Sequence, residues 1–174
     1  CLAVAACMLP VGACGGVLSV DCSGGGDYLT IQEALDHSAD GDTIRVAPCA
    51  YVERITIPND RELTIAGAGA DSVVLEWPGS ERVLTLGNYG PTLRDITVRS
   101  GSSGTAIGND WPVMAGLPLY DVSIEGRVSL YGPASAVRSK IESFGAGARS
   151  QGCSFDSCRV GYASVGGVQF QGGY

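Results

Sequence analysis

Two aspartates occupy equivalent places in a repeated segment of this sequence. The run LRDITVRSG starts at Leu93 and the related run LYDVSIEGR at Leu119, so Asp95 and Asp121 coincide. If the two runs stack as neighbouring strands, their carboxylates lie about 4.8 Å apart. Adjacent carboxylates can bind calcium or act as an acid–base pair. Aspartate also suits turns, and we expect a structural turn role for both residues, with calcium as the one cofactor to consider.

Two tryptophans are the best candidates for contact with a ligand. Trp77 and Trp111 are each followed by proline and lie in predicted loops. The apolar face of a tryptophan ring stacks on other rings, and its indole N–H can donate a hydrogen bond. These properties favour contact with a polysaccharide or another cell-surface component. The alternative is that each loop folds back and buries its ring against the core.

Four cysteines lie outside the apolar N-terminal segment, namely Cys22, Cys49, Cys153 and Cys158. In an oxidising compartment they can form two disulfides. A bridge between Cys22 and Cys49 would tie a predicted helix to the following strand, which we expect to end at Cys49. Cys153 and Cys158 can pair only if the short segment between them folds back. Zinc binding is the weaker interpretation, because the sequence contains no C-x-x-C pair.

The N-terminal segment, residues 1–16, is apolar and uncharged. It is shorter than the roughly 20 residues that span a bilayer, and it matches the apolar region of a secretory signal peptide. The stretch from Val11 to Cys14 resembles a bacterial lipobox, which would make Cys14 the lipidated residue. An ordinary secretion signal is the alternative. We therefore expect a secreted or cell-envelope protein that contacts a membrane only through a lipid anchor.

Composition and charge limit the possible partners. The chain has 174 residues, 45% of them hydrophobic, which suits one domain with a real core. Its formal net charge is −7, and Lys140 is the only lysine. No basic cluster occurs, which argues against nucleic acid as a partner. An acidic polysaccharide would be repelled by the overall charge unless a local arginine or metal compensates.

One short helix is predicted near the N-terminus, over residues 30–38. Thr30 and Glu33 have the spacing of a capping box. An apolar face is formed by Ile31, Ala34 and Leu35. Gly41 suits a left-handed residue at the end of the helix.

After this helix the sequence consists of short β-rich runs separated by turn residues, including TIRVA, RITI, LTIAG, SVVLE and RVLTLG. Together with the repeats from Leu93 and Leu119, these runs indicate a solenoid. We expect an all-β fold, a right-handed parallel β-helix over residues 17–174, with the helix as its N-terminal cap. The helix would cover the open apolar end and the unpaired strand edge.

The stretch GDYLTIQEALDHSADGDTIRVAPCAYVERITI from Gly26, followed by LTIAGAGADSVVLE, resembles the N-terminal part of the pectin-lyase-like superfamily. It is most similar to the opening of pectin esterases, whose Gly-x-Tyr-x-Glu signature reads Cys49-Ala-Tyr51-Val-Glu53 here. The resemblance implies a right-handed parallel β-helix. Period-two spacing places Tyr51 and Glu53 on one strand face, where we expect a surface pair.

The resemblance does not supply a catalytic site. The later pectin-esterase motifs Q-A-V-A-L, Q-D-T-L, D-F-I-F-G and L-G-R-P-W do not occur, and GTAIG at Gly104 lacks the glutamine of the first. The only histidine, His37, leaves the polygalacturonase set incomplete. Because the chain stops at Tyr174 in an apparent coil, we expect a fragment.

Three functions remain open at this point. The first is an exported, non-catalytic β-helix protein of the cell envelope that binds a glycan or another surface protein. The second is a polysaccharide-active enzyme of the esterase or lyase type, whose catalytic coils lie beyond Tyr174. The third is a purely structural repeat segment of a large surface protein. One scaffold of this kind hosts many activities, so the fold alone does not separate them.

Overall fold

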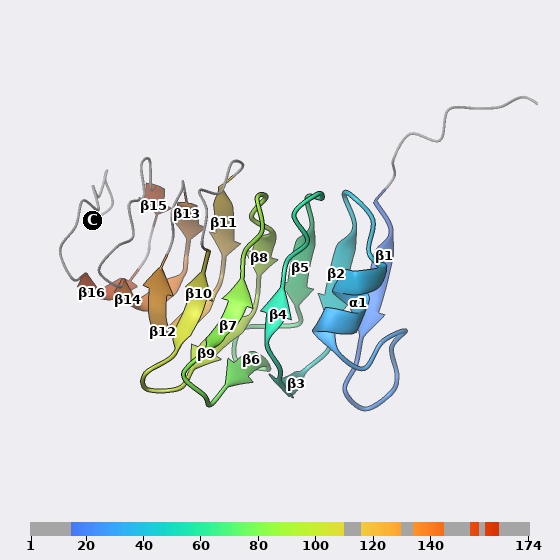
Figure 1. The fold of residues 1–174 in the computed structure, drawn as a ribbon, viewed down its shortest axis with the longest axis horizontal. Helices are drawn as coiled ribbons and strands as arrows, with labels where there is room; N and C mark the ends of the chain where they lie inside the picture. The colour runs from blue at the N-terminus through green and yellow to red at the C-terminus, as the bar shows by residue number, and fades with distance from the viewer. Residues whose placement is uncertain (1–14, 110–115, 130–133, 145–153, 157–158, 164–174) are drawn as a thin grey trace, which may run out of the picture.

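The computed structural model describes residues 15–109, 116–129, 134–144, 154–156 and 159–163. They form a parallel β-helix whose coils stack along one axis, with a short helix at the N-terminal end (Figure 1). The single helix of the described residues is α1, Ile31–His37. The predicted all-β solenoid with a capping helix is therefore confirmed, and the connections between its parallel strands are right-handed, as such crossovers nearly always are.

The strands belong to two parallel sheets. Sheet A contains, in spatial order, β1 (Val17–Val20), β2 (Thr43–Val46), β5 (Thr64–Gly67), β8 (Thr92–Arg94), β11 (Leu117–Tyr120), β13 (Ala134–Val137) and β15 (Ser154–Asp156). Sheet B contains β3 (Cys49–Val52), β6 (Val73–Trp77), β9 (Thr97–Ser100), β12 (Ser123–Ser129), β10 (Thr105–Gly108), β7 (Arg82–Thr85) and β4 (Ile55–Thr56). Beyond β12, sheet B continues through β14 (Lys140–Phe144) and β16 (Arg159–Ala163).

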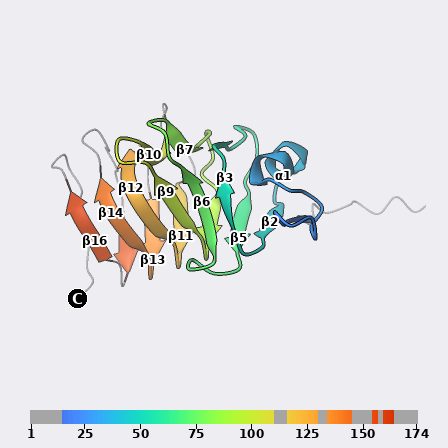
Figure 2. The same ribbon diagram turned by 90° about the horizontal axis from the view of Figure 1, so that it is seen from below.

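Sheet B has two arms that meet at β12. The first half of β12 pairs with β9 and the second half with β10. Figure 2 shows the strands β6, β9 and β12 of one arm side by side. Gly126 lies at the bend with φ 132°, a backbone conformation that side-chain-bearing residues rarely adopt. The bend turns one long strand through the corner of the coil.

Columns of inward-facing side chains form the core. In sheet A the column is Ile44, Ile65, Leu93, Leu119 and Ala136. In sheet B it is Tyr51, Leu75, Val98, Ile124 and Ile141. All of these residues are buried, and a large apolar side chain contributes about 1.5–3 kcal/mol when it is fully buried. The register also places Leu93 beside Leu119, which confirms the repeat read from the sequence.

The helix covers the open end of the first coil. The Thr30 hydroxyl accepts a hydrogen bond from the Glu33 N–H at 3.2 Å, as the capping-box spacing predicted. The predicted C-terminal signal was wrong, because the helix ends at His37 and is capped by Ser38, whose N–H and hydroxyl both bond the Leu35 carbonyl. Gly41 does adopt a positive φ of 82°, but in the following turn.

The exposed edge of β1 is covered by a loop, and the helix covers only the apolar end. The Tyr28 N–H donates to the Ser19 carbonyl at 3.0 Å, and the Asp21 N–H donates to the Tyr28 carbonyl at 3.0 Å. The Asp27 carboxylate accepts from the Ser19 N–H at 3.1 Å. These bonds occupy part of the edge that would otherwise pair with another strand.

A disulfide joins this loop to sheet B. Cys22 and Cys49 are bonded, with their Cα atoms 6.4 Å apart. Cys49 begins β3, so the prediction that it ends the strand after the helix was wrong. The bridge encloses both α1 and β2, and it therefore fixes the cap to the first coil.

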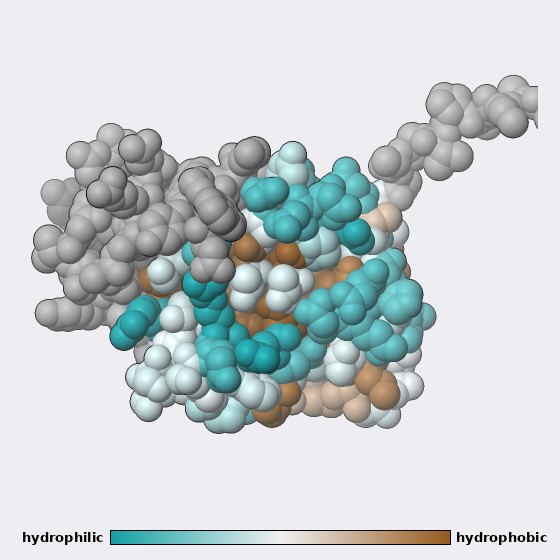
Figure 3. All heavy atoms as spheres, in the orientation of Figure 1, coloured by the Kyte–Doolittle hydropathy of each residue, from teal (hydrophilic) through white to brown (hydrophobic). Residues whose placement is uncertain are grey.

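No helix among the described residues is both long and apolar enough to cross a membrane. On the face shown in Figure 3, an apolar patch lies over β4 and β7 and is bordered by hydrophilic residues.

Candidate functional site

The stacked aspartates are corner residues. Asp95 and Asp121 both have φ 53°, and they follow β8 and β11 at equivalent places in successive coils. Aspartate tolerates this left-handed conformation better than most residues do. Arg138, the next residue of the same column, forms a two-bond ion pair with the Asp121 carboxylate.

Hydrogen bonding from the Arg138 side chain lowers the pKa of Asp121 below its ordinary value. Asp121 is therefore ionised and already paired at neutral pH. The geometry gives both aspartates a turn function and leaves Asp121 poorly suited to proton transfer. Within the described residues, no group of three or more His, Cys, Asp and Glu side chains is arranged to hold a metal ion.

Tyr51 and Glu53 do not form the surface pair that their spacing predicted. Tyr51 is buried, and its hydroxyl donates to the Ala47 carbonyl at 3.0 Å. Burial raises the pKa of Tyr51, so the hydroxyl keeps its proton. Glu53 lies just beyond β3 and accepts bonds from the N–H groups of Ile31 at 2.8 Å and Gln32 at 3.1 Å. The signature thus fastens α1 onto the first coil.

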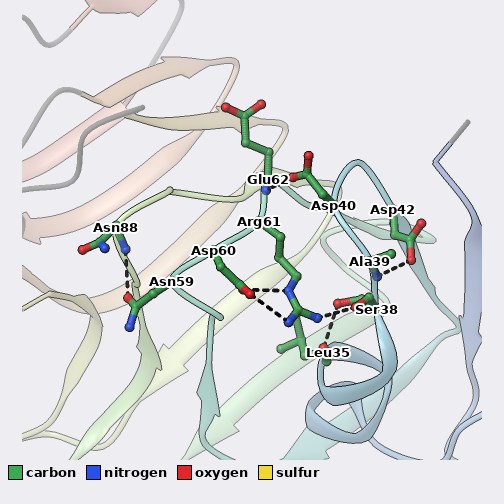
Figure 4. Close-up of polar contacts among 10 residues, drawn as sticks. All are labelled: Leu35, Ser38, Ala39, Asp40, Asp42, Asn59, Asp60, Arg61, Glu62 and Asn88. Atoms are coloured by element: carbon green, nitrogen blue, oxygen red, sulfur yellow. Dashed lines mark hydrogen bonds and ion pairs between the residues drawn. The ribbon is translucent and has the colours of Figure 1, made fainter. Parts of the chain in front are cut away.

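Acidic residues also gather at the corner between α1 and β5, shown in Figure 4. Asp60 pairs with Arg61 at 2.9 Å, and the Arg61 guanidinium also donates to the Ser38 carbonyl. This pairing lowers the pKa of Asp60. Asp40 accepts from the Glu62 N–H at 2.7 Å. These polar contacts hold consecutive turns together.

The strongest candidate site surrounds Trp77, which is half-buried and packs against the core, as the alternative interpretation of its sequence predicted, while its ring also borders the outer face of sheet B. Trp77 is the last residue of strand β6, so the prediction that it lies in a loop was wrong. It lines a pocket of about 360 Å³ together with Val52, Pro78 and Arg99. Val52 is 58% exposed and, with Pro78, gives the pocket a mainly apolar wall. Such a wall beside a few polar groups is typical of small-ligand sites.

Neighbouring charges fix the orientation of the tryptophan ring. The Trp77 Nε1–H donates to Glu81 at 2.9 Å, and this bond lowers the pKa of Glu81. The Arg54 guanidinium lies 5.4 Å from the ring centroid. Both contacts hold the ring in its position at the pocket.

A ladder of three charged side chains crosses the coils beside Trp77. Arg99 pairs with Glu76 at 3.1 Å and with Glu125 at 2.6 Å. The hydrogen bond from Arg99 to Glu125 has the largest effect and the one to Glu76 the next largest, and both raise the pKa of Arg99. Strand register places Glu76, Arg99 and Glu125 side by side on β6, β9 and β12. Their carboxylate oxygens can still accept hydrogen bonds from hydroxyl groups of a ligand.

Sequence reasoning missed this ladder, although a signal was present. Arg99 and Glu125 occupy the same place in the two repeats that contain Asp95 and Asp121. Opposite charges at equivalent repeat positions predict an ion pair between neighbouring coils. Glu76 could not be found in this way, because its own run does not share the repeat pattern.

Several predicted residues lie outside the part of the chain that the structure describes. These are Cys14, Trp111, Cys153 and Cys158. Their predicted roles in lipidation, ligand contact and disulfide formation stay predictions.

Comparison with solved structures identifies pectin methylesterases as similar folds. Pectin methylesterase PemA from Erwinia chrysanthemi superposes with a TM-score of 0.62 at 16% identity, covering 84% of this chain and 54% of that one. The carrot enzyme gives 0.53 at 17% identity, covering 84% and 63%. A pectin methylesterase in complex with a hexasaccharide gives 0.61 at 16% identity, covering 82% and 54%.

These similarities show that the chain has the pectin-lyase-like parallel β-helix fold. The chain spans between half and two thirds of the length of these enzymes. No protein-family model matches the sequence, and no curated protein matches it.

Proposed function

We propose that this protein is an exported β-helix protein that binds a glycan on the outer face of sheet B without transforming it. The observation that carries the proposal is the Trp77 pocket, in which a ring held by Glu81 and Arg54 lies next to the ladder through Arg99. An aromatic ring beside fixed carboxylates and guanidinium groups offers both the apolar contact and the hydrogen bonds that a sugar ring needs.

Two observations support the non-catalytic and exported parts of the proposal. The carboxylates beside Trp77 are committed, Glu81 to the indole N–H and Glu76 and Glu125 to Arg99. None of them is a free general acid or base. Separately, the Cys22–Cys49 disulfide is typical of an oxidising compartment outside the cytoplasm.

The test is binding of pectic, alginate-like and neutral polysaccharides by the wild-type protein and by Trp77→Ala. Released methanol, acetate, reducing ends and unsaturated products are followed in the same samples. We expect retention of at least one polymer, no product, and a loss of about tenfold or more in affinity for Trp77→Ala, since stacking on an aromatic ring contributes about 1–3 kcal/mol.

Two variants control for folding and for general aromatic contact. Trp77→Phe keeps a stacking face and should restore most of the affinity. Tyr120→Ala removes an aromatic side chain that is 37% exposed on sheet A, and it should leave binding unchanged. Binding that is the same in wild type and Trp77→Ala would refute the assignment of the site.

The second candidate is a carbohydrate esterase, and the similarity to pectin methylesterases favours it. It predicts methanol release from methyl-esterified pectin by the longer protein to which these coils would belong. Release of methanol at a rate that Trp77→Ala does not change would favour the enzyme over the binding protein.

A further inference from the structure

A second pocket continues the Trp77 site along the solenoid axis. It measures about 410 Å³ and shares Arg99, Ser100 and Gly101 with the Trp77 pocket. Glu125 and Arg127, both on β12, form its far wall. The two pockets therefore lie on either side of Arg99 and form one continuous groove across several coils.

Arg127 is the arginine of this groove that forms no ion pair with a described residue. Arg99 is paired with both Glu76 and Glu125, so these three side chains together carry one net negative charge, which Arg127 balances. Arg127 is exposed on the outer face of β12, and no described residue pairs with its guanidinium. The groove is therefore neutral within a chain of net charge −7, and the uncommitted N–H donors of Arg127 are what an anion would meet there.

Ser102, which lines the same pocket, adds further donors. It is exposed in the turn that the Gly104 N–H closes by donating to the Gly101 carbonyl at 2.9 Å. Neither the hydroxyl nor the N–H of Ser102 bonds another residue of the described ranges. The pocket thus presents uncommitted donors, and Arg127 supplies several in a planar fork that matches an oxyanion.

The strand register gives the direction of the groove. Val52, Glu76, Arg99 and Glu125 are successive partners on β3, β6, β9 and β12. Parallel strands lie about 4.8 Å apart, so the groove from Val52 to Glu125 is about 14 Å long. A ligand that fills it runs along the solenoid axis and spans more than one sugar ring.

We propose that the ligand is a glycan with an oxyanion substituent, a sulfate ester or a carboxylate, bound by Arg127 and Ser102 while a sugar ring contacts Trp77. This proposal rests on glycan binding at Trp77 and adds the chemical class of the ligand and its direction. The overall negative charge then acts as a filter, because only an anion that reaches Arg127 gains a compensating contact.

Dextran, dextran sulfate and carboxymethyl-dextran of equal length test the proposal, because they share a backbone and differ in charge. We expect the wild-type protein to bind one or both charged polymers about tenfold more tightly than dextran, which corresponds to about 1.4 kcal/mol. Arg127→Gln should reduce this preference to less than about threefold. Which charged polymer binds distinguishes sulfate from carboxylate.

Arg45→Gln is the matched control, since Arg45 is an exposed arginine on sheet A that also lacks a partner among the described residues. It makes the same change in net charge and should keep the full preference. No preference in the wild type, or equal losses in Arg45→Gln and Arg127→Gln, would overturn the oxyanion site.

Trp77→Ala separates the two proposals. If it weakens binding of all three polymers while Arg127→Gln keeps the charge preference, only the oxyanion site fails. If it leaves all three affinities unchanged, glycan binding at Trp77 fails and the oxyanion site fails with it. Absence of binding by the folded wild-type protein to all three polymers overturns both proposals.

Discussion

Replacement of Glu53 tests whether the Tyr-x-Glu signature serves the scaffold or a reaction. The two carboxylate oxygens of Glu53 accept separate bonds from the N–H groups of Ile31 and Gln32, at 2.8 and 3.1 Å. These N–H groups belong to the first turn of α1, where no intrahelical partner exists. In Glu53→Gln one oxygen is replaced by an NH₂ group, which opposes a backbone N–H instead of accepting from it.

The expected loss follows from these two bonds. A hydrogen bond to a charged group contributes about 1.5–3 kcal/mol, and removal of a helix N-cap costs about 0.5–2 kcal/mol. Glu53 is half-buried, so solvent weakens both bonds. We expect Glu53→Gln to lower the free energy of unfolding by about 1.5 kcal/mol and Glu53→Ala by about 2.5 kcal/mol. For a chain of this length, the alanine variant should melt about 5–10 °C lower.

Urea unfolding followed by circular dichroism measures the free-energy change. Glu62→Gln is the matched control, because it removes the same charge from a side chain that bonds no other described residue and points away from the corner in Figure 4. Its stability should stay within about 0.5 kcal/mol of wild type. If Glu53→Gln is as stable as Glu62→Gln, the bonds from Glu53 to the first turn of α1 do not contribute to stability, and the scaffold interpretation of the signature is wrong.

Three further predictions concern stability. Replacing Cys22 and Cys49 together by alanine should lower the free energy of unfolding by about 3.5 kcal/mol, because the bridge closes a loop of 27 residues; urea titration without reductant measures this, and equal stability would contradict it. Ser100→Ala should leave the free energy of unfolding unchanged or raise it by about 1 kcal/mol, since the buried Ser100 hydroxyl lacks a partner among the described residues. A clear loss of stability in the same titration would contradict this, because it would mean that the hydroxyl makes a stabilising hydrogen bond. Wild type should be more stable than Asp121→Asn at neutral pH. The difference should vanish as the pH falls through the lowered pKa of Asp121, because protonation breaks the ion pair with Arg138. A difference that persists in acid would exclude the ion pair as its cause.

The sequence was most informative where a residue's role depends on local spacing. The capping box at Thr30 and the repeat through Leu93 and Leu119 were both confirmed, because each depends on short-range periodicity. The predicted run RITI contains β4, whereas β3 was not among the predicted runs. Glu53 lies between these two strands, where its carboxylate accepts a hydrogen bond from α1.

The candidate site was less accessible to sequence reasoning. Trp77 was selected for its residue type, but its pocket depends on Val52 and Arg99, which lie on neighbouring coils. Their proximity follows from the register between strands, and register is fixed by the inward-facing residues of the same strands. Only the Arg99–Glu125 pair carried a signal of its own, through the repeat.

Inward-facing residues serve the scaffold, whereas outward-facing residues determine what is bound. This division explains why the resemblance of the N-terminal stretch to pectin esterases says little about activity. Tyr51 and Glu53 bond the backbone of the first coil and its cap, so the scaffold itself requires them. Arg99 and Arg127 are outward residues whose side chains the core does not constrain, and a different ligand would need only different residues at these positions. We therefore expect exchange of Arg127 to alter ligand preference without loss of stability, whereas exchange of Glu53 should do the reverse. Affinity and unfolding free energy measured on both variants would show this double dissociation, and a variant that changes both quantities together would contradict it.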